Sequence, residues 1–180
     1  MPDRVRGAVF ETIGSRLGTP GALPAIRVLD LFAGSGSIGL EALSRGAAWC
    51  TFVERDRAAL SALRHNLTGL AGDEAGTLAK IIRADAFAVR QWSRLVYGMP
   101  CDLIVVDPPY PDSRRVAPIG PVVRLLEALA ETPLLAEGAC VVLRHEAKVP
   151  YDRRKYGRLR ATEVRRYGST AVTYLTCDPK

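Results

Sequence analysis

Helical and strand-like patterns of apolar residues alternate along most of the 180-residue chain. Where apolar residues recur every three or four positions, the pattern predicts a helix with one buried face. Short, continuous apolar runs are typical of strands that are covered on both faces. By these criteria helices are expected at 4–17, 38–44, 57–70, 87–95 and 122–130, and strands at 27–32, 49–53, 79–82, 102–106 and 139–143.

The C-terminal segment follows a different pattern. Residues 159–164 and 169–176 are both strand-like, and the turn at Gly168 between them leaves no room for a crossover helix. The sequence therefore predicts an α/β fold, in which a mostly parallel sheet has helices on both faces and ends in an antiparallel hairpin. The chain has the length of one domain, and neither a repeat nor a low-complexity linker divides it.

Composition limits the class of protein. Hydrophobic residues make up 48% of the chain and charged residues 24%, which is the balance of a globular chain and not of a disordered one. No apolar run approaches the roughly 18 residues of a membrane span, and residues 1–6 lack the apolar core of a signal peptide. We therefore expect a cytoplasmic protein with no membrane partner.

Basic charge is concentrated in one segment. The net charge is +6, and residues 144–166 alone carry nine basic and three acidic side chains, which is the same excess. Tyr151, Tyr156 and Tyr167 lie among these charges, and tyrosines beside arginines can stack bases while phosphates are held. The pattern favours an RNA-binding surface, although a solvated face is the alternative for any charge run. The candidate RNA-binding residues of this segment are Arg153, Arg154, Lys155 and Tyr167.

The sequence does not predict a metal site. The four cysteines stand singly, without the C-x-x-C spacing of a zinc site, and His65 and His145 are the two histidines. A protein metal site usually draws several such ligands from short, regular spacings. We therefore expect no bound metal.

A glycine-rich turn follows the first expected strand. The segment Gly34-Ser35-Gly36-Ser37-Ile38-Gly39 fits the pattern G-x-G-x-x-G, and Glu54 ends the next strand 20 positions after Gly34. Glycines let the backbone approach a ligand closely, and the acid can accept both hydroxyls of a ribose. Taken alone, this combination is typical of an NAD site as well as of an S-adenosylmethionine (SAM) site.

Two acidic residues favour SAM over NAD. Asp30 lies at the strand end before the glycines, where a carboxylate suits a cationic amino group or a sulfonium and would repel a pyrophosphate. Asp85 follows the third expected strand, where it can accept a hydrogen bond from an adenine amine while Phe87 packs on the ring. Asp85 could also be the N-cap of the following helix, and the two roles are compatible.

The fourth expected strand ends in Asp107-Pro108-Pro109-Tyr110, at the sheet edge where α/β proteins bind ligands. These residue types suit an amino group attached to an aromatic base, which is a poor nucleophile because its lone pair is delocalised. The Asp107 carboxylate and a proline carbonyl can accept the two amine hydrogens, and Tyr110 offers a face to the base. As the nitrogen attacks a methyl sulfonium, the carboxylate stabilises the positive charge that the nitrogen gains.

These motifs, in this order, resemble those of the bacterial 16S rRNA guanine-N2 methyltransferase family. The resemblance rests on residues 28–36, on Phe52-Val53-Glu54, on residues 102–110 and on residues 166–170, and it extends over nearly the whole chain. It implies one class I, SAM-dependent methyltransferase domain over residues 1–180, with a Rossmann-like, mostly parallel sheet of seven strands. It also implies methyl transfer to the 2-amino group of a guanine, with 16S rRNA or the small ribosomal subunit as partner.

The resemblance implies a role for each matching residue. The residues expected to bind the cofactor are Asp30, Phe32, Gly34, Ser35, Gly36, Glu54, Arg55, Asp85 and Ala86. The residues expected to hold the target amine are Asp107, Pro108, Pro109 and Tyr110. Within the first set, Asp30 corresponds to the methionine end, Glu54 to the ribose and Asp85 to the adenine. Arg4, on the first expected helix, is expected to bind RNA, with a cofactor contact or a plain surface charge as alternatives.

The chain departs from that family at its start. Members begin with a basic, glycine-containing β-hairpin that is expected to help bind RNA, whereas this sequence starts at the helix that follows. A truncated chain, a misplaced start codon and a member with a different substrate each account for the difference. Three other functions stay open from the sequence: adenine-N6 methylation of DNA or RNA, NAD-dependent oxidoreduction, and RNA binding without catalysis.

Overall fold

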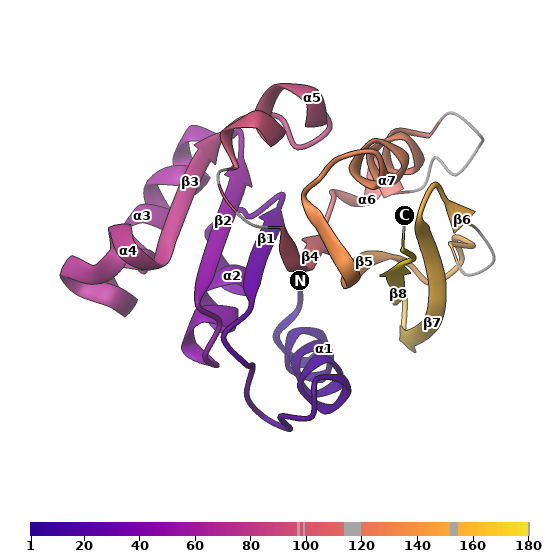
Figure 1. Ribbon diagram of the computed structural model, residues 1–180, viewed down its shortest axis with the longest axis horizontal. Helices are drawn as coiled ribbons and strands as arrows, with labels where there is room; N and C mark the ends of the chain where they lie inside the picture. The colour runs from indigo at the N-terminus through magenta and orange to yellow at the C-terminus, as the bar shows by residue number, and fades with distance from the viewer. Residues whose placement is uncertain (97, 99, 114–119, 152–154, 180) are drawn as a thin grey trace.

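A sheet of eight strands forms the centre of the computed structural model, which describes residues 1–96, 98, 100–113, 120–151 and 155–179. The strand order is β3-β2-β1-β4-β5-β8-β7-β6 (Figure 1). The strands are β1 (Arg27–Leu31), β2 (Trp49–Glu54), β3 (Ala79–Arg83), β4 (Cys101–Val106), β5 (Leu135–Glu146), β6 (Lys155–Tyr156), β7 (Leu159–Tyr167) and β8 (Thr170–Cys177). The helices are α1 (Asp3–Arg16), α2 (Ser37–Ser44), α3 (Arg57–Ala71), α4 (Ala75–Leu78), α5 (Val89–Trp92), α6 (Tyr110–Ser113) and α7 (Pro121–Ala130), with 3-10 turns η1 (Gly72–Glu74) and η2 (Ser93–Leu95). None of the described helices is long and apolar enough to cross a membrane.

The predicted fold class is confirmed, with one difference in the strand count. β1 pairs in parallel with β2 and β4, β5 continues the parallel part, and β8 pairs antiparallel with β5 and β7. The described residues contain eight strands and not seven, because Lys155 and Tyr156 pair with Arg160 and Leu159 as the short strand β6. Two residues are too few to leave an alternating pattern in the sequence.

Both faces of the parallel part are covered, which explains the continuous apolar runs. In β4, Leu103 and Val105 belong to the apolar cluster that contains the buried residues of α1, α2 and α3. Ile104 and Val106 belong to the second cluster, with the buried residues of α5 and α7. Successive side chains of a strand point to opposite faces, so both positions of each pair must be apolar when helices cover both faces.

Two elements differ from their expected bounds for local reasons. β5 is 12 residues long, whereas the expected strand covers only 139–143. The expected strand starts too late because the exposed Glu137 and Gly138 interrupt the apolar pattern. The register between β4 and β5 also shifts in this region, between Cys101 and Leu103. The helix expected at 87–95 starts later, at Val89, because the residues before it form a turn in which the N–H of Ala88 donates to the carbonyl of Asp85. Its last three residues form the 3-10 turn η2.

Candidate functional site

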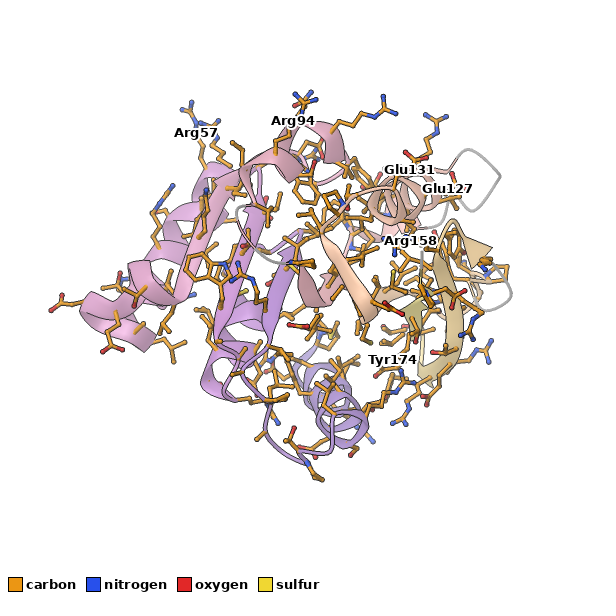
Figure 2. The ribbon with its side chains drawn as sticks, viewed as in Figure 1. Arg57, Arg94, Glu127, Glu131, Arg158 and Tyr174 are labelled. Atoms are coloured by element: carbon orange, nitrogen blue, oxygen red, sulfur yellow. The ribbon has the colours of Figure 1, made fainter. Side chains whose placement is uncertain are left out.

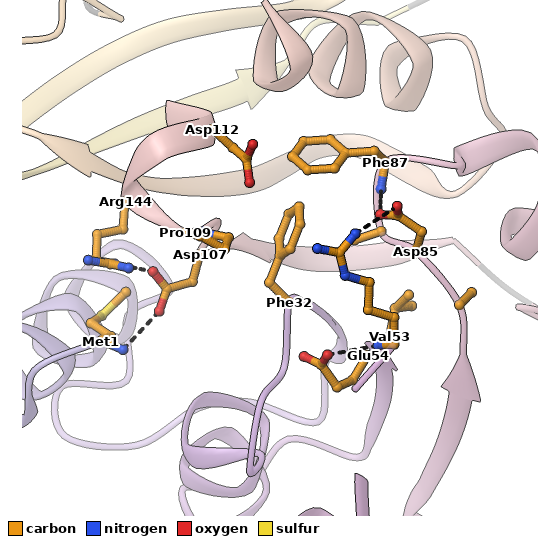
Figure 3. Close-up of a pocket in the computed structure, with 13 residues that line it drawn as sticks. Met1, Phe32, Val53, Glu54, Asp85, Phe87, Asp107, Pro109, Asp112 and Arg144 are labelled. Carbon is orange, nitrogen blue, oxygen red and sulfur yellow. Dashed lines mark hydrogen bonds and ion pairs between the residues drawn. The ribbon is translucent and has the colours of Figure 1, made fainter. Parts of the chain in front are cut away.

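A cavity of about 300 Å³ opens at the carboxyl ends of β1, β2, β3 and β4 (Figure 3). Sheets of this type bind their ligands at this edge. Of the residues that the sequence predicts for the site, the cavity is lined by Phe32, Glu54, Arg55, Asp85, Ala86, Asp107 and Pro109. Those that do not line it are Asp30, Gly34, Ser35, Gly36 and Pro108. Its wall also contains Met1, Phe87, Asp112 and Arg144.

The glycine-rich turn is required by backbone conformation and by packing. Gly34 and Gly36 have φ angles of 57° and 87°, a region that favours glycine. A Cβ on Gly36 would lie 2.3 Å from Leu63 Cδ1, and one on Gly39 would lie 2.2 Å from the Phe52 ring. These two glycines therefore let α2 pack closely on α3 and β2. A Cβ on Gly34 would meet no heavy atom within 4 Å, so that side of the turn is open.

Glu54 ends β2 with its carboxylate fixed by three backbone N–H groups. Oε2 accepts the N–H of Gly34 at 2.8 Å, and Oε1 accepts those of Arg55 and Asp56, also at 2.8 Å. A carboxylate has about four lone-pair sites, so Glu54 can still accept a hydroxyl from the cavity that it lines. The geometry thus presents an oriented acceptor beside the glycine turn.

Asp85 and two phenylalanines form another part of the wall. Asp85 Oδ1 accepts the N–H of Phe87 at 3.1 Å, and Oδ2 pairs with Arg55 Nη1 at 3.1 Å. The alternative role of Asp85 as a helix N-cap does not hold, because its carboxylate closes a turn and Ala88 is the N-cap of α5. The rings of Phe32 and Phe87 meet edge to face with centroids 4.9 Å apart (Figure 3). An apolar wall beside a carboxylate fits a heteroaromatic ring that carries an amine.

Asp30 is a fully buried carboxyl group in β1, two residues before Phe32. Its Oδ2 accepts the N–H of Gly39 at 2.9 Å, and its Oδ1 has no hydrogen-bond partner among the described residues. Burial raises the pKa of Asp30 from 3.8 to about 7, the Gly39 hydrogen bond opposes that rise, and the negative charge of Asp107 adds to it. A cationic ligand group near Asp30 would favour its charged form.

Asp107 follows β4, and each of its carboxylate oxygens accepts from a cationic group (Figure 3). Oδ1 accepts from Nε of Arg144, and Oδ2 pairs with the Met1 ammonium at 2.9 Å. Nη2 of Arg144 also donates to the carbonyl of Pro108 at 3.4 Å. The Asp107 side chain is 7% exposed, so its charge is largely removed from water. Tyr110 begins α6, and its side chain lies outside the described part of the structure.

Arg144 lines the cavity, although in the sequence it stands out only as part of the basic segment 144–166. The register of β4 and β5 pairs Val106 with Leu143, so Asp107 and Arg144 are the next residues of two neighbouring parallel strands. A lone arginine directly after the apolar run 139–143 is the signal that could have indicated it. That inference needs the strand order, because two helices separate β4 from β5 along the chain.

The tyrosines of the basic segment do not form the expected stacking surface. Tyr151 and Tyr156 are at most 1% exposed and belong to the apolar cluster on the α5 and α7 face of the sheet. The expectation that these two rings stack bases is therefore wrong, because their apolar area is used in the core. Tyr167, at the end of β7, is half-buried.

Several basic side chains of the same segment bind other parts of the chain. Arg158, labelled in Figure 2, donates to the carbonyls of Ala130 at 3.2 Å and Asp178 at 3.3 Å. Lys155 pairs with the carboxylate of Asp178 at 3.0 Å. Arg4 is exposed on α1 and does not line the cavity. Two further candidates lie outside the described residues, namely Arg153 and Arg154.

Comparison with known proteins gives a family and named relatives. A family model described as conserved hypothetical protein 95 matches residues 1–176. The chain is 34% identical over 171 residues to the putative rRNA methyltransferase YlbH of Bacillus subtilis, covering 94% of this chain and 83% of that protein. It is 37% identical over 108 residues to the ribosomal RNA small subunit methyltransferase D of Escherichia coli, covering 60% of this chain and 48% of that protein. Among solved structures, the putative methyltransferase yhhF from Escherichia coli is 30% identical, with a TM-score of 0.73 over 99% of this chain and 86% of that one.

Proposed function

The chain belongs to the family described as conserved hypothetical protein 95, and from this premise we propose that it is a SAM-dependent rRNA methyltransferase. The proposed target is the 2-amino group of a guanine in 16S rRNA, either free or within the small ribosomal subunit. The relatives named as rRNA methyltransferases confirm the resemblance inferred from the motifs at the level of the family. What we propose beyond the family is the identity of the methylated base, the methylated atom and the roles of the site residues.

The observation that carries the proposal is the pair of acceptors at the end of β4. The Asp107 carboxylate and the Pro108 carbonyl both accept N–H groups, here from the guanidinium of Arg144. An exocyclic amine on a base offers two N–H groups to the same acceptors. Because Asp107 shares its cavity with Glu54 and Asp85, an amine held at this corner would lie next to a cofactor bound along the wall.

The residues around the cavity fit SAM. Glu54 can still accept a ribose hydroxyl, and Asp85 can accept a hydrogen bond from the adenine amine. Phe87 can pack against the adenine ring. The buried Oδ1 of Asp30 lacks a partner among the described residues, and a negative charge there suits the cationic methionine end. When bound, SAM supplies a methyl group activated by a sulfonium.

Asp107 and Pro108 would act on the amine by orientation and charge. By accepting the two amine hydrogens, they turn the nitrogen lone pair toward the cavity. As the nitrogen gains positive charge, the Asp107 carboxylate stabilises it, and the low exposure of the side chain, 7%, strengthens that interaction. No strong base is needed, because the methylated nitrogen is acidic and releases its proton readily.

Nucleoside mass spectrometry tests the proposed base and atom. Incubation with SAM and unmethylated 16S rRNA, or with small subunits that contain it, is expected to produce N2-methylguanosine. The arm that reacts faster identifies the free RNA or the subunit as substrate. N6-methyladenosine in its place would transfer the activity to adenine, and methylation of duplex DNA without methylation of rRNA would contradict the proposal.

Calorimetry with Glu54→Gln tests the cofactor. We expect SAM to bind the variant about tenfold to a hundredfold more weakly, which is the usual effect of losing a hydrogen bond to a charged group. The matched control is Asp73→Asn, which changes an exposed carboxylate of η1 outside the cavity and should leave the SAM affinity unchanged. Tight NAD binding without SAM binding would instead support the oxidoreductase alternative, and RNA binding without turnover would support a non-catalytic module.

A further inference from the structure

Arg144 occupies the acceptors that the proposed function assigns to the target amine. Its Nε donates to Asp107 Oδ1, and its Nη2 donates to the Pro108 carbonyl at 3.4 Å. The guanidinium therefore makes with its own N–H groups the two contacts that an exocyclic amine would make. The arginine and the amine would have to use this pair of acceptors one after the other.

Electrostatic repulsion also prevents Arg144 from staying on Asp107 while the target amine reacts there. The Arg144 side chain is 12% exposed and that of Asp107 is 7% exposed, so water screens their charges little. A guanidinium that stayed on Asp107 would oppose the positive charge that develops on an attacking nitrogen. Among the described residues, the Met1 ammonium also pairs with Asp107, and Asp30 interacts with it electrostatically. The same cavity wall contains the charged side chains of Glu54, Arg55, Asp85 and Asp112. The Met1 ammonium on Oδ2 opposes that charge in the same way, but Arg144 also occupies the Pro108 carbonyl, so a reaction at this corner requires that Arg144 release both acceptors.

We propose that Arg144 exchanges partners when the target nucleotide enters the site. It holds Asp107 and Pro108 beforehand, then yields these acceptors to the target amine and pairs with a phosphate of the same nucleotide. A guanidinium suits both partners, because its planar fork of donors binds carboxylates and phosphates with similar geometry. The proposal rests on the proposed function and adds to it a phosphate-binding residue at the site of the reaction.

Steady-state kinetics with unmethylated rRNA tests the exchange. For Arg144→Ala we expect kcat near that of the wild type, because the guanidinium has left Asp107 before methyl transfer. We expect KM for RNA to rise by up to about a hundredfold, because a charge-assisted contact to phosphate is lost, and the Asp107 pair that the wild type must break reduces this rise. The slope of log affinity against log salt concentration should fall by about 0.7 to 0.9, the value for one phosphate contact.

Arg144→Lys distinguishes the effect of the positive charge from that of the planar guanidinium donors. The lysine variant should keep the salt slope of the wild type and show an intermediate KM, because it keeps the charge and loses the fork of donors. The matched control is Arg64→Ala, which removes an exposed arginine of α3 outside the cavity and should leave KM unchanged. If the alanine variant does not fold, as judged by its thermal melting and SAM binding, the lysine variant decides by the same split between KM and kcat.

Two results would overturn the exchange. A fall in kcat as large as that of an Asp107 variant, at unchanged KM, would mean that Arg144 acts during methyl transfer itself. An unchanged salt slope in the alanine variant would remove the phosphate contact. Both differ from failure of the proposed function, in which the wild-type protein would methylate no rRNA at all.

Discussion

Asp107→Ala is expected to lower kcat for rRNA methylation by a factor of about a hundred to a thousand, or about 3–4 kcal/mol of transition-state stabilisation. The carboxylate is one of the two acceptors proposed for the target amine and is the group that stabilises the positive charge developing on nitrogen. At 7% exposure, water replaces little of that interaction when the side chain is removed. SAM affinity should stay close to that of the wild type, because the proposed cofactor contacts come from other residues.

The measurement is single-turnover methyl transfer from labelled SAM, with SAM affinity by calorimetry as a check on folding. Asp107→Asn keeps an acceptor oxygen for Arg144 and removes the charge, so a comparable loss in this variant would assign the effect to charge. Asp73→Asn changes an exposed carboxylate of η1 outside the cavity and should react at the wild-type rate. An Asp107→Ala protein that retains most of its activity would remove Asp107 from the mechanism.

Asp30→Asn is expected to change how the stability of the protein depends on pH, by up to about 4 kcal/mol. Burial raises the pKa of Asp30 from 3.8 to about 7, so between these values the folded protein binds more protons at this site than the unfolded chain. The free energy of unfolding of the wild type should therefore fall as the pH rises from about 4 to about 7. The asparagine does not titrate and lacks this contribution.

Urea unfolding of both proteins across this pH range tests the prediction, in the absence of added SAM. The difference between the two free energies of unfolding should change steadily from pH 4 to pH 7 and stay constant above it. Any pH-independent cost of placing an amide beside Gly39 cancels in this comparison. Ser61→Ala, at an exposed side chain of α3 that does not titrate, is the control and should give curves parallel to the wild type. Parallel curves for Asp30→Asn would show that the Asp30 carboxyl is not buried as described.

The parts of the fold that the sequence predicted well are those imposed by local rules. The run 102–106 is continuous and apolar because helices cover both faces of β4, and the structure places a strand there. The glycines of 34–39 were recognisable because α2 packs so closely that Gly36 and Gly39 leave no space for a Cβ. The two-residue strand β6 was missed because it is too short to show the alternation of apolar and polar residues that indicates a strand.

Aromatic residues among charges were the least predictable part of the chain. Tyr151 and Tyr156 stand in the most basic segment, yet both are in the core. Tyr156 buries its ring while Lys155, its neighbour in β6, is exposed, because successive strand residues point to opposite faces. Composition alone therefore could not distinguish a stacking surface from a buried layer.

By itself, the sequence was enough to predict an α/β sheet with an antiparallel end and to place Glu54, Asp85 and Asp107 at the ends of parallel strands. Strand ends are local features, and parallel strands bring their carboxyl ends to one edge, so these acids had to lie near one cavity. Only the tertiary structure decided that Arg144 pairs with Asp107 and that Asp30 is sealed from water. Both facts depend on which strands are neighbours and on what covers them, and residues far apart in the chain determine that.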